Sequence, residues 1–359
     1  MLKYFDNFFE DKKVLITGHT GFIGSWLTIL LIELSAKVIG YSLPPYTKKD
    51  NFIVTNLEDK ITHIVGDIRD YKKLNKTIEK SKPDIAIHLA AQPIVRESYE
   101  IPKETYDVNI GGTINLLESF RKSSSCKILI NFTTDKVYEN LELKRGYNEN
   151  DRLGGFDPYS SSKACSELIT SAYRNSFFNI TKNGDNKFLS TVRCGNVIGG
   201  GDWQKDRLIP DCMKSILTNK EIVIRNPNSV RPWQYVLEPI RGLLLLAKKM
   251  WNEGSFFSSA WNLGPNKEDI FTVRDIIEKI IAYLRKGKYI TISNQCNDEL
   301  HETKLLLLDS SKAYKYLNWK NELLIEDAIK FICDWYASKN VDYEFDIKQI
   351  NEYFKKIKT

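Results

Sequence analysis

The chain has few of the residues that build metal centres and disulfide frameworks. Its 359 residues include six cysteines and four histidines, which are dispersed and form no CxxC pair. Structural zinc sites and disulfide scaffolds depend on closely spaced cysteines, so this pattern argues against both. We therefore expect no metal ligands.

Long apolar runs and a strong charge of one sign are also missing. The densest aliphatic stretch, residues 243–247, is far too short to span a bilayer. The N-terminus has no basic segment followed by an apolar one, so no signal peptide is expected. The net charge of +6 comes from 52 basic and 46 acidic residues mixed along the chain, which leaves no nucleic-acid patch. These features predict a cytoplasmic protein that binds neither membrane nor nucleic acid.

The length predicts two domains, because a single core usually stops growing at about 250–300 residues. Apolar strand-like runs alternate with helical patterns up to about residue 195. Such alternation predicts an α/β fold with a doubly wound parallel sheet, a Rossmann domain. The expected strands are 14–17, 37–41, 61–66, 85–89, 128–133 and 190–194, with helices at 26–34, 71–80, 105–122 and 159–175.

The domain boundary is expected near residue 195. We predict a Rossmann domain over residues 1–195, with a return segment near 236–263, and a smaller, interleaved substrate domain over 196–359. Glycine, asparagine and proline punctuate the second part, which indicates loops between short helices. The expected helices there are 209–218, 239–251, 272–285 and 326–338.

A glycine-rich turn joins the first strand to the first helix. Gly18, Gly21 and Gly24 follow the strand at 14–17 with GxxGxxG spacing. Glycines in this position let backbone amides approach a pyrophosphate, and the helix N-terminus faces its negative charge. The turn therefore predicts a dinucleotide site.

Two acid–base pairs lie further along the chain. Tyr159 and Lys163 are four residues apart on an expected helix, so both side chains share one face. The ammonium can lower the pKa of the phenol and make it a usable base. Asp135 and Lys136 follow Thr134 where an apolar strand ends, and could alternatively form a simple surface ion pair. Two proton-transfer pairs suggest redox chemistry coupled to an elimination.

The glycine turn together with the Tyr159–Lys163 pair is the signature of the short-chain dehydrogenase/reductase superfamily, and the chain resembles an extended member. Within it, residues 10–265 resemble the CDP-glucose 4,6-dehydratases. The matching segments are 88–92, 135–140, 154–159, 193–203, 206–211, 224–227 and 231–234.

That resemblance implies a lyase that uses NAD to convert CDP-D-glucose to CDP-4-dehydro-6-deoxy-D-glucose, in deoxysugar biosynthesis for surface polysaccharides such as O-antigen. It assigns Tyr159 as the base at the C4 hydroxyl, which Thr134 also binds, and Lys163 as the ribose-binding cation. Lys136 removes the C5 proton while Asp135 protonates the departing C6 hydroxyl.

The same resemblance identifies the cofactor contacts. Asp67 and Ile68 are expected to hold the adenine, although Asp67 could instead cap the following helix. The second strand ends without the acidic residue that usually holds the ribose of NAD, so the choice of NAD over NADP rests on the resemblance. The expected contacts are Gly18, His19, Thr20, Gly21, Phe22, Ile23, Gly24, Asp67, Ile68, Leu89, Ala90, Ala91, Gln92, Asn109, Thr133, Tyr159, Lys163 and Arg193.

Arginines and loop residues of the second part are expected to hold the nucleotide sugar. Guanidinium groups bind diphosphates bidentately, although any single arginine could equally be surface. The expected substrate contacts are Arg96, Asn196, Asp202, Trp203, Arg207, Leu208, Ile209, Arg225 and Arg231.

Alternatives remain open at this stage. Another nucleotide-sugar enzyme of this fold, such as an epimerase, a reductase or a dehydratase for a different nucleotide, would share most motifs. A non-catalytic NAD-binding regulator has no reason to retain the acid–base residues. The helices at 105–122 and 159–175 carry more apolar positions than one sheet needs, which predicts a homodimer or a dimer of dimers. These positions are Val108, Ile110, Leu116, Leu117, Ala164, Leu168, Ile169 and Ala172.

Overall fold

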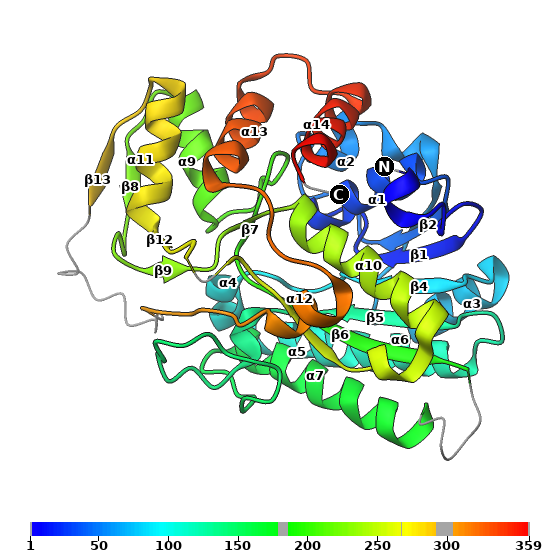
Figure 1. The fold of residues 1–359 in the computed structure, drawn as a ribbon. Helices are drawn as coiled ribbons and strands as arrows, with labels where there is room; N and C mark the ends of the chain where they lie inside the picture. The colour runs from blue at the N-terminus through cyan, green and yellow to red at the C-terminus, as the bar shows by residue number, and fades with distance from the viewer. Residues whose placement is uncertain (1, 179–185, 267, 292–303, 358–359) are drawn as a thin grey trace.

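A seven-stranded parallel sheet forms the centre of the molecule (Figure 1). The computed structural model describes residues 2–178, 186–266, 268–291 and 304–357. The strand order is β11-β6-β5-β4-β1-β2-β3, which confirms the predicted α/β fold with a doubly wound sheet. The strands are β1 (Lys13–Thr17), β2 (Lys37–Ser42), β3 (Thr62–Val65), β4 (Ile85–His88), β5 (Ile128–Phe132), β6 (Phe188–Cys194) and β11 (Ala260–Leu263).

The central strands are apolar because both faces of the sheet are covered. Every residue of β4, β5 and β6 is buried. Strands buried on both sides tend to read as apolar runs. Apolar runs predicted six of the seven strands, including the edge strand β3, which is only partly buried. Strand β11, which carried no strand prediction, pairs in parallel with β6 and extends the sheet at that edge.

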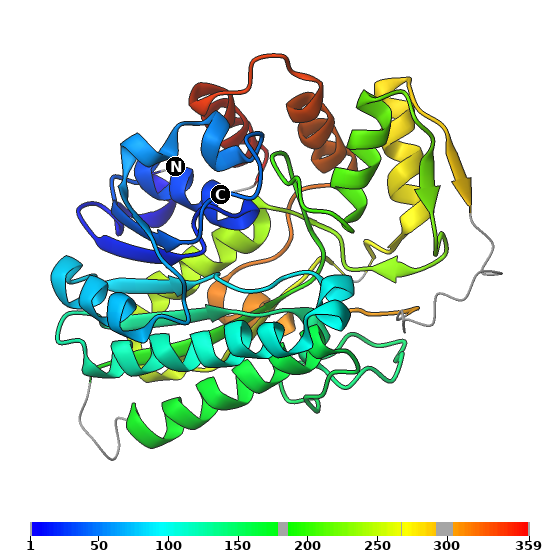
Figure 2. The same ribbon diagram turned by 180° about the vertical axis from the view of Figure 1, so that it is seen from behind.

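Helices cover the sheet in two layers, which are seen from opposite sides in Figures 1 and 2. One face packs against α3 (Tyr71–Ser81), α6 (Gly112–Lys122) and α7 (Pro158–Phe177). The other packs against α1 (Phe22–Glu33) and α10 (Leu237–Glu253). No helix in the described ranges has both the length and the apolar composition needed to cross a membrane.

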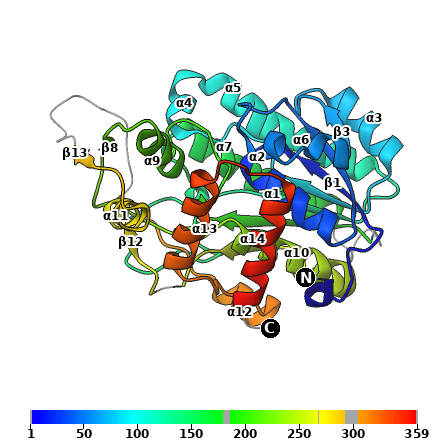
Figure 3. The same cartoon turned by 90° about the horizontal axis from the view of Figure 1, so that it is seen from above.

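A smaller group of elements stands beside the carboxyl ends of the strands, as the view from above shows (Figure 3). It contains α9 (Leu208–Leu217), α11 (Val273–Leu284), α13 (Ile325–Ala337) and the parallel pair β8 (Ile222–Ile224) and β13 (Tyr289–Thr291). Two further short strand pairs accompany the pair of β8 and β13 in this part of the chain. They are β7 (Val197–Ile198) with β10 (Gln234–Tyr235), and β9 (Val230–Arg231) with β12 (Phe271–Thr272).

The remaining elements are short or terminal. They are η1 (Leu2–Phe5), α2 (Asn51–Val54), η2 (Leu57–Lys60), α4 (Val95–Glu100), α5 (Pro102–Tyr106), η3 (Asp107–Gly111), η4 (Asp135–Val137), η5 (Gly254–Phe257), α12 (Ser311–Leu317) and α14 (Tyr343–Lys356). The last helix, α14, was not predicted. It returns to α1, where the Tyr343 hydroxyl donates to Glu33 Oε1 at 3.0 Å. The division into two domains at residue 195 stays a prediction.

Candidate active site

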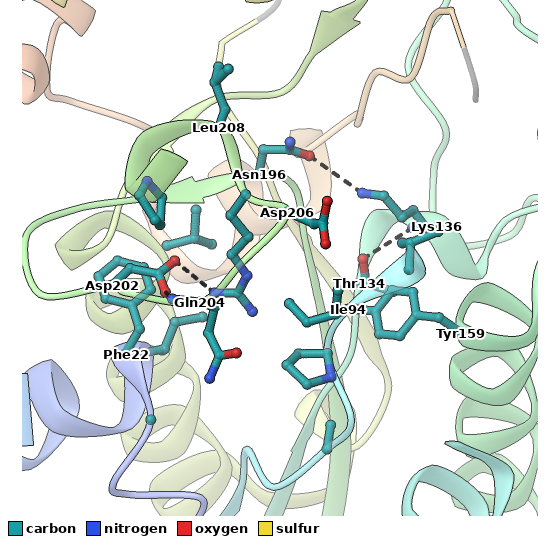
Figure 4. Close-up of a pocket in the computed structure, with 18 of the residues that line it drawn as sticks. Phe22, Ile94, Thr134, Lys136, Tyr159, Asn196, Asp202, Gln204, Asp206 and Leu208 are labelled. Atoms are coloured by element: carbon teal, nitrogen blue, oxygen red, sulfur yellow. Dashed lines mark hydrogen bonds and ion pairs between the residues drawn. The ribbon is translucent and has the colours of Figure 1, made fainter. Parts of the chain in front are cut away.

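A cavity of about 1590 Å³ runs along the carboxyl ends of the strands and into the smaller group of elements (Figure 4). Its wall extends from the glycine turn after β1 to α9 and β8. A site for one drug-sized ligand typically measures about 300–1,000 Å³. The cavity therefore has room for two ligands side by side, at the edge of the sheet where α/β proteins bind nucleotides.

The glycine turn is packed too closely for side chains. Gly18 has a φ of +79°, and a Cβ there would lie 2.6 Å from the Ala90 nitrogen. A Cβ on Gly24 would lie 2.3 Å from the Gly18 oxygen. Helix α1 begins at Phe22, and its N-cap, Gly21, makes no side-chain capping bond. The first amides of α1 thus have no capping side chain and lie at the cavity, an arrangement that suits an anion.

Most of the expected cofactor residues line this cavity. Their side chains or backbone come from the ends of β1, β3, β4 and β5, from the start of α1 and from α7. The lining members are Gly18, Thr20, Gly21, Phe22, Ile23, Gly24, Asp67, Ile68, Leu89, Ala90, Ala91, Thr133, Tyr159 and Lys163.

His19 differs from the other members of the turn, because its ring is buried behind it. A Cβ on Gly40 would lie 2.3 Å from the ring, and His19 Nε2 lies 2.7 Å from His63 Nδ1. Burial lowers the pKa of His19 to about 3, so the ring is neutral. The side chain therefore supports the turn from behind, and only the backbone of His19 belongs to the loop.

Asp67 lines the cavity, but its carboxylate is already engaged. Arg69 donates to it through Nη2 at 2.6 Å and through its backbone nitrogen at 2.8 Å. The alternative role as a helix cap belongs to Asp70, which accepts from the Lys73 nitrogen at the start of α3. An adenine amine at Asp67 would share the carboxylate with Arg69.

Gln92 and Asn109 lie behind the cavity wall. The Gln92 nitrogen donates to Asn109 Oδ1 at 2.9 Å, and Asn109 Nδ2 donates to the Gln92 oxygen at 3.1 Å and to Ser162 Oγ at 2.9 Å. Asn109 lies in η3, a π-helical turn between α5 and α6. Its buried amide therefore ties the loop after β4 to α7, the helix that carries Tyr159.

Tyr159 and Lys163 both reach the cavity from α7. The helix begins with Asp157 as N-cap, whose side chain accepts from the Ser160 nitrogen at 2.9 Å. Lys163 Nζ lies 3.4 Å from the Phe132 oxygen at the end of β5. The predicted shared face of this helix is confirmed.

The predicted lowering of the pKa of Tyr159 is wrong in this structure. Burial raises the pKa of Tyr159 to about 12, although the Thr134 hydroxyl opposes the shift. Burial also lowers the pKa of Lys163 to about 8, while the charge of Glu167 opposes that change. Dehydration of both groups outweighs the attraction expected between them.

Asp135 and Lys136 form an ion pair next to Tyr159. Lys136 Nζ lies 3.0 Å from Asp135 Oδ1, and the Thr134 hydroxyl donates to the same oxygen at 2.8 Å. Asp135 is fully buried and lies behind Thr134 and Lys136, which line the cavity. Lys136 Nζ also lies 3.4 Å from Asn196 Oδ1, a contact drawn in Figure 4. The pair is therefore partly buried, unlike a surface salt bridge.

Glu167 is a buried residue of this region that the sequence interpretation missed. Its Oε2 lies 2.9 Å from Arg193 Nη2, and the hydroxyls of Thr133 and Thr191 donate to its two oxygens at 2.6 and 2.8 Å. Although burial opposes it, these partners lower the pKa of Glu167. Arg193 thus lies behind the cavity wall as the partner of Glu167. Glu167 lies four residues after Lys163, and this spacing, which places both residues on one face of the helix, was the signal in the sequence that could have identified Glu167.

The expected substrate residues gather at the other end of the cavity. Arg207 Nη1 donates to Asp202 Oδ2 at 2.8 Å, and Arg225 pairs with Asp206 at 3.3 Å. Arg96 approaches the same Asp206 at 3.9 Å. The members that line the cavity are Arg96, Asn196, Asp202, Trp203, Arg207, Leu208, Ile209, Arg225 and Arg231.

Some lining residues were not expected from the sequence. Ile94, Gln204 and Asp206 project into the cavity in Figure 4, and Asp211 lines it from α9. Asp206 and Asp211 belong to the 206–211 segment that had already been singled out.

Comparison with known proteins agrees with this architecture. Residues 15–332 match the family model described as GDP-mannose 4,6 dehydratase. The chain is 45% identical over 333 residues to the CDP-glucose 4,6-dehydratase of Salmonella typhimurium, covering 92% of each chain.

Two solved structures share the fold. One is the dTDP-glucose 4,6-dehydratase of Bacillus anthracis in complex with NAD, with a TM-score of 0.72, 24% identity and coverage of 90% of this chain and 96% of that one. The other is the UDP-glucose 4-epimerase of Thermotoga maritima with UDP-glucose, with a TM-score of 0.76, 22% identity and coverage of 90% and 98%. The chain therefore belongs to the GDP-mannose 4,6-dehydratase family of extended short-chain dehydrogenase/reductases.

Proposed function

We propose that this chain is an NAD-dependent hydro-lyase that converts CDP-D-glucose to CDP-4-dehydro-6-deoxy-D-glucose and water. The observation that carries the proposal is the Asp135–Lys136 ion pair beside Tyr159, with Lys136 and Tyr159 lining one cavity. A second proton-transfer pair is what a dehydratase needs beyond simple oxidation. The 45% identity to a CDP-glucose 4,6-dehydratase supports the choice of nucleotide sugar.

The residues along one side of the cavity fit a dinucleotide. The crowded turn at Gly18 and Gly24 leaves backbone, rather than side chains, facing the cavity. The uncapped start of α1 would hold the pyrophosphate, and Lys163 would hold the ribose hydroxyls. Thr20, Ser42 and Leu43 form the wall where the adenosine ribose would lie, with Thr20 Oγ1 at 2.8 Å from Ser42 Oγ. When bound, NAD accepts hydride from C4 of the sugar and returns it to C6.

In this mechanism Tyr159 takes the proton of the C4 hydroxyl. Burial raises the pKa of Tyr159 to about 12, so the phenol is protonated at neutral pH in this structure. The positive charges of Lys163 and of a bound oxidised nicotinamide would have to stabilise the phenolate before Tyr159 could act as the base. Thr134 holds the same C4 hydroxyl in position for proton transfer to Tyr159. Lys163 would stabilise the negative charge of that phenolate.

The elimination follows from a shift of one proton within the ion pair. Along the 3.0 Å contact, Lys136 passes a proton to Asp135, which leaves a neutral amine and a neutral acid. The amine removes the C5 proton, made acidic by the C4 ketone, and the acid protonates the departing C6 hydroxyl as water. Asp135 lies behind Thr134 and Lys136, so its proton leaves through one of them. The ion pair is then restored.

We also propose that two copies associate through α6 and α7. Leu168 is 57% exposed and Ile114 is 36% exposed, which is unusual for large apolar side chains. By contrast Leu116, Leu117 and Ala164 are buried within the subunit, so these three expected contact residues are already used. The contact would be isologous and would form a four-helix bundle. Light scattering at micromolar concentration tests it, and a mass near 41.6 kDa would contradict it.

The proposed function is tested by incubating the purified protein with NAD and each of CDP-, dTDP-, UDP- and GDP-glucose. Formation of a 4-keto-6-deoxy product from CDP-glucose is expected. Epimerised sugar without loss of water would instead favour an epimerase, and absence of any product would favour a non-catalytic role. Faster turnover of another nucleotide sugar would overturn the substrate while leaving the dehydration chemistry in place.

A further inference from the structure

The end of the cavity remote from the glycine turn is formed by α9 and β8. On α9, Leu208, Asp211 and Ser215 all line the cavity. Their spacing of three and four residues places them on one face of the helix. Residues 222–224 of β8 line the cavity as well. A flat ring bound between α9 and β8 would therefore meet apolar side chains and one carboxylate.

Asp211 differs from the other acidic residues at this end of the cavity. Asp202 and Asp206 are paired with Arg207 and Arg225 at 2.8 and 3.3 Å. For Asp211, no ion pair with a lysine or arginine is formed within the part of the chain that the structure describes. Its side chain is half-buried. Such a carboxylate has lost water without gaining a cation, which leaves it ready to accept from a ligand.

The electrostatics of Asp211 agree with this geometry. Burial raises the pKa of Asp211, and the nearby charge of Asp206 adds to the shift. Lys214, Arg225 and a backbone hydrogen bond from Asp206 act in the opposite direction but do not cancel it. A donor from a ligand would relieve the cost of burying the charge.

The order of groups in the proposed substrate puts the nucleobase at this end. The hexose must lie at Tyr159, where the chemistry occurs, and Arg225 and Arg231, which line the cavity together with Arg96 and Arg207, are suited to the diphosphate. The base then lies beyond them, along α9.

We propose that Asp211 determines the nucleobase specificity, by accepting a hydrogen bond from the exocyclic amine of cytosine. This inference rests on the proposed function. Cytosine presents an N4 amine where uracil and thymine present an O4 acceptor, and aspartate is a matching acceptor for that amine. The same carboxylate repels O4, so Asp211 both favours cytosine and disfavours the other two pyrimidines.

The test measures binding of CDP and of UDP to the full-length protein by titration calorimetry, for the wild type, Asp211→Asn and Asp206→Asn. The wild type should prefer CDP. An amide can donate to O4 as readily as it accepts from N4. Loss of the negative charge weakens the hydrogen bond that accepts from N4, so Asp211→Asn should weaken CDP about 5- to 10-fold and leave UDP unchanged or tighter.

Asp206→Asn is the matched control, since it is the same substitution in the same cavity at a carboxylate paired with Arg225. It should change both affinities by the same factor. Equal weakening of CDP and UDP by Asp211→Asn, or a selective loss of CDP in Asp206→Asn, would overturn the role of Asp211. A wild type that binds UDP as tightly as CDP would instead overturn the proposed substrate, a result visible without any substitution.

Discussion

Replacing Glu167 with glutamine should cost a large part of the stability of this chain, because the change breaks a buried ion pair. The side chains of Arg193 and Glu167 are 5% and 3% exposed, and their charged atoms lie 2.9 Å apart. Removing one partner of such a pair typically costs about 3–5 kcal/mol, since the other charge is left buried.

The contacts around the pair narrow this range. In Glu167→Gln, Arg193 still has the Tyr138 hydroxyl at 2.9 Å and the Glu149 oxygen at 3.2 Å as hydrogen-bond partners. The cost of leaving the Arg193 charge without its carboxylate therefore falls near the lower limit of that range, about 3 kcal/mol. Glutamine offers one acceptor where glutamate offers two. Thr133 can turn to the Val192 oxygen at 3.2 Å, whereas Thr191 would lose its acceptor at a cost of about 1 kcal/mol. We expect a total loss of about 4 kcal/mol.

Urea unfolding followed by tryptophan fluorescence measures this loss, with Glu326→Gln as control. Glu326 pairs with Lys279 at 2.7 Å but its side chain is 64% exposed, so the same substitution should cost less than about 1 kcal/mol. Glu167→Gln combined with Arg193→Met should recover part of the loss, because no unpaired charge remains. If Glu167→Gln and Glu326→Gln unfold at the same urea concentration, the buried pair is not stabilising in the way argued.

Three further predictions concern catalysis and pH. Tyr159→Phe keeps the ring but removes the proton acceptor, so turnover should fall by roughly two to four orders of magnitude with unchanged circular dichroism; near-normal turnover would rule out the mechanism. Lys136→Ala should stall loss of water and slow solvent-deuterium exchange at C5 of the sugar, and exchange at the wild-type rate would move the base elsewhere. Burial raises the pKa of Asp346 to about 8, so the folded state keeps a proton that the unfolded state releases above about pH 4. The stability contributed by this group is therefore lost as the pH rises toward 8. Between pH 5 and 8 the free energy of unfolding of the wild type, measured with urea, should fall by about 4 kcal/mol relative to that of Asp346→Asn. Parallel curves of this free energy against pH for the two proteins would show that Asp346 is ionised in the fold.

The strands, the glycine turn and the face of α7 could be predicted from the sequence because each depends on residues that are close in the chain. A strand buried on both faces needs only a short, mostly apolar run, and β4 and β5 have one, whereas β6 also buries Ser190, Thr191 and Arg193. Gly18 and Gly24 are glycines because of a local backbone turn, and Tyr159 and Lys163 share a face because helical geometry is fixed. Helix α14 was missed because its sequence is mostly polar and its buried face, with Ile350 and Tyr353, is recognised only in the folded chain, where Arg241 of α10 donates to the Tyr353 hydroxyl.

The partners and the charge states of the site were decided by tertiary structure. Lys136 meets Asn196, sixty residues further along, only because both lie at the carboxyl ends of strands in one sheet. Arg193 pairs with Glu167 behind the cavity wall because α7 packs across β6, a contact that no local pattern encodes. The pKa of Tyr159 moved upward rather than downward because the surrounding protein removes water from the phenol. Spacing along the chain determines which face a side chain occupies, whereas burial and long-range packing determine what that side chain meets there and which charge it carries.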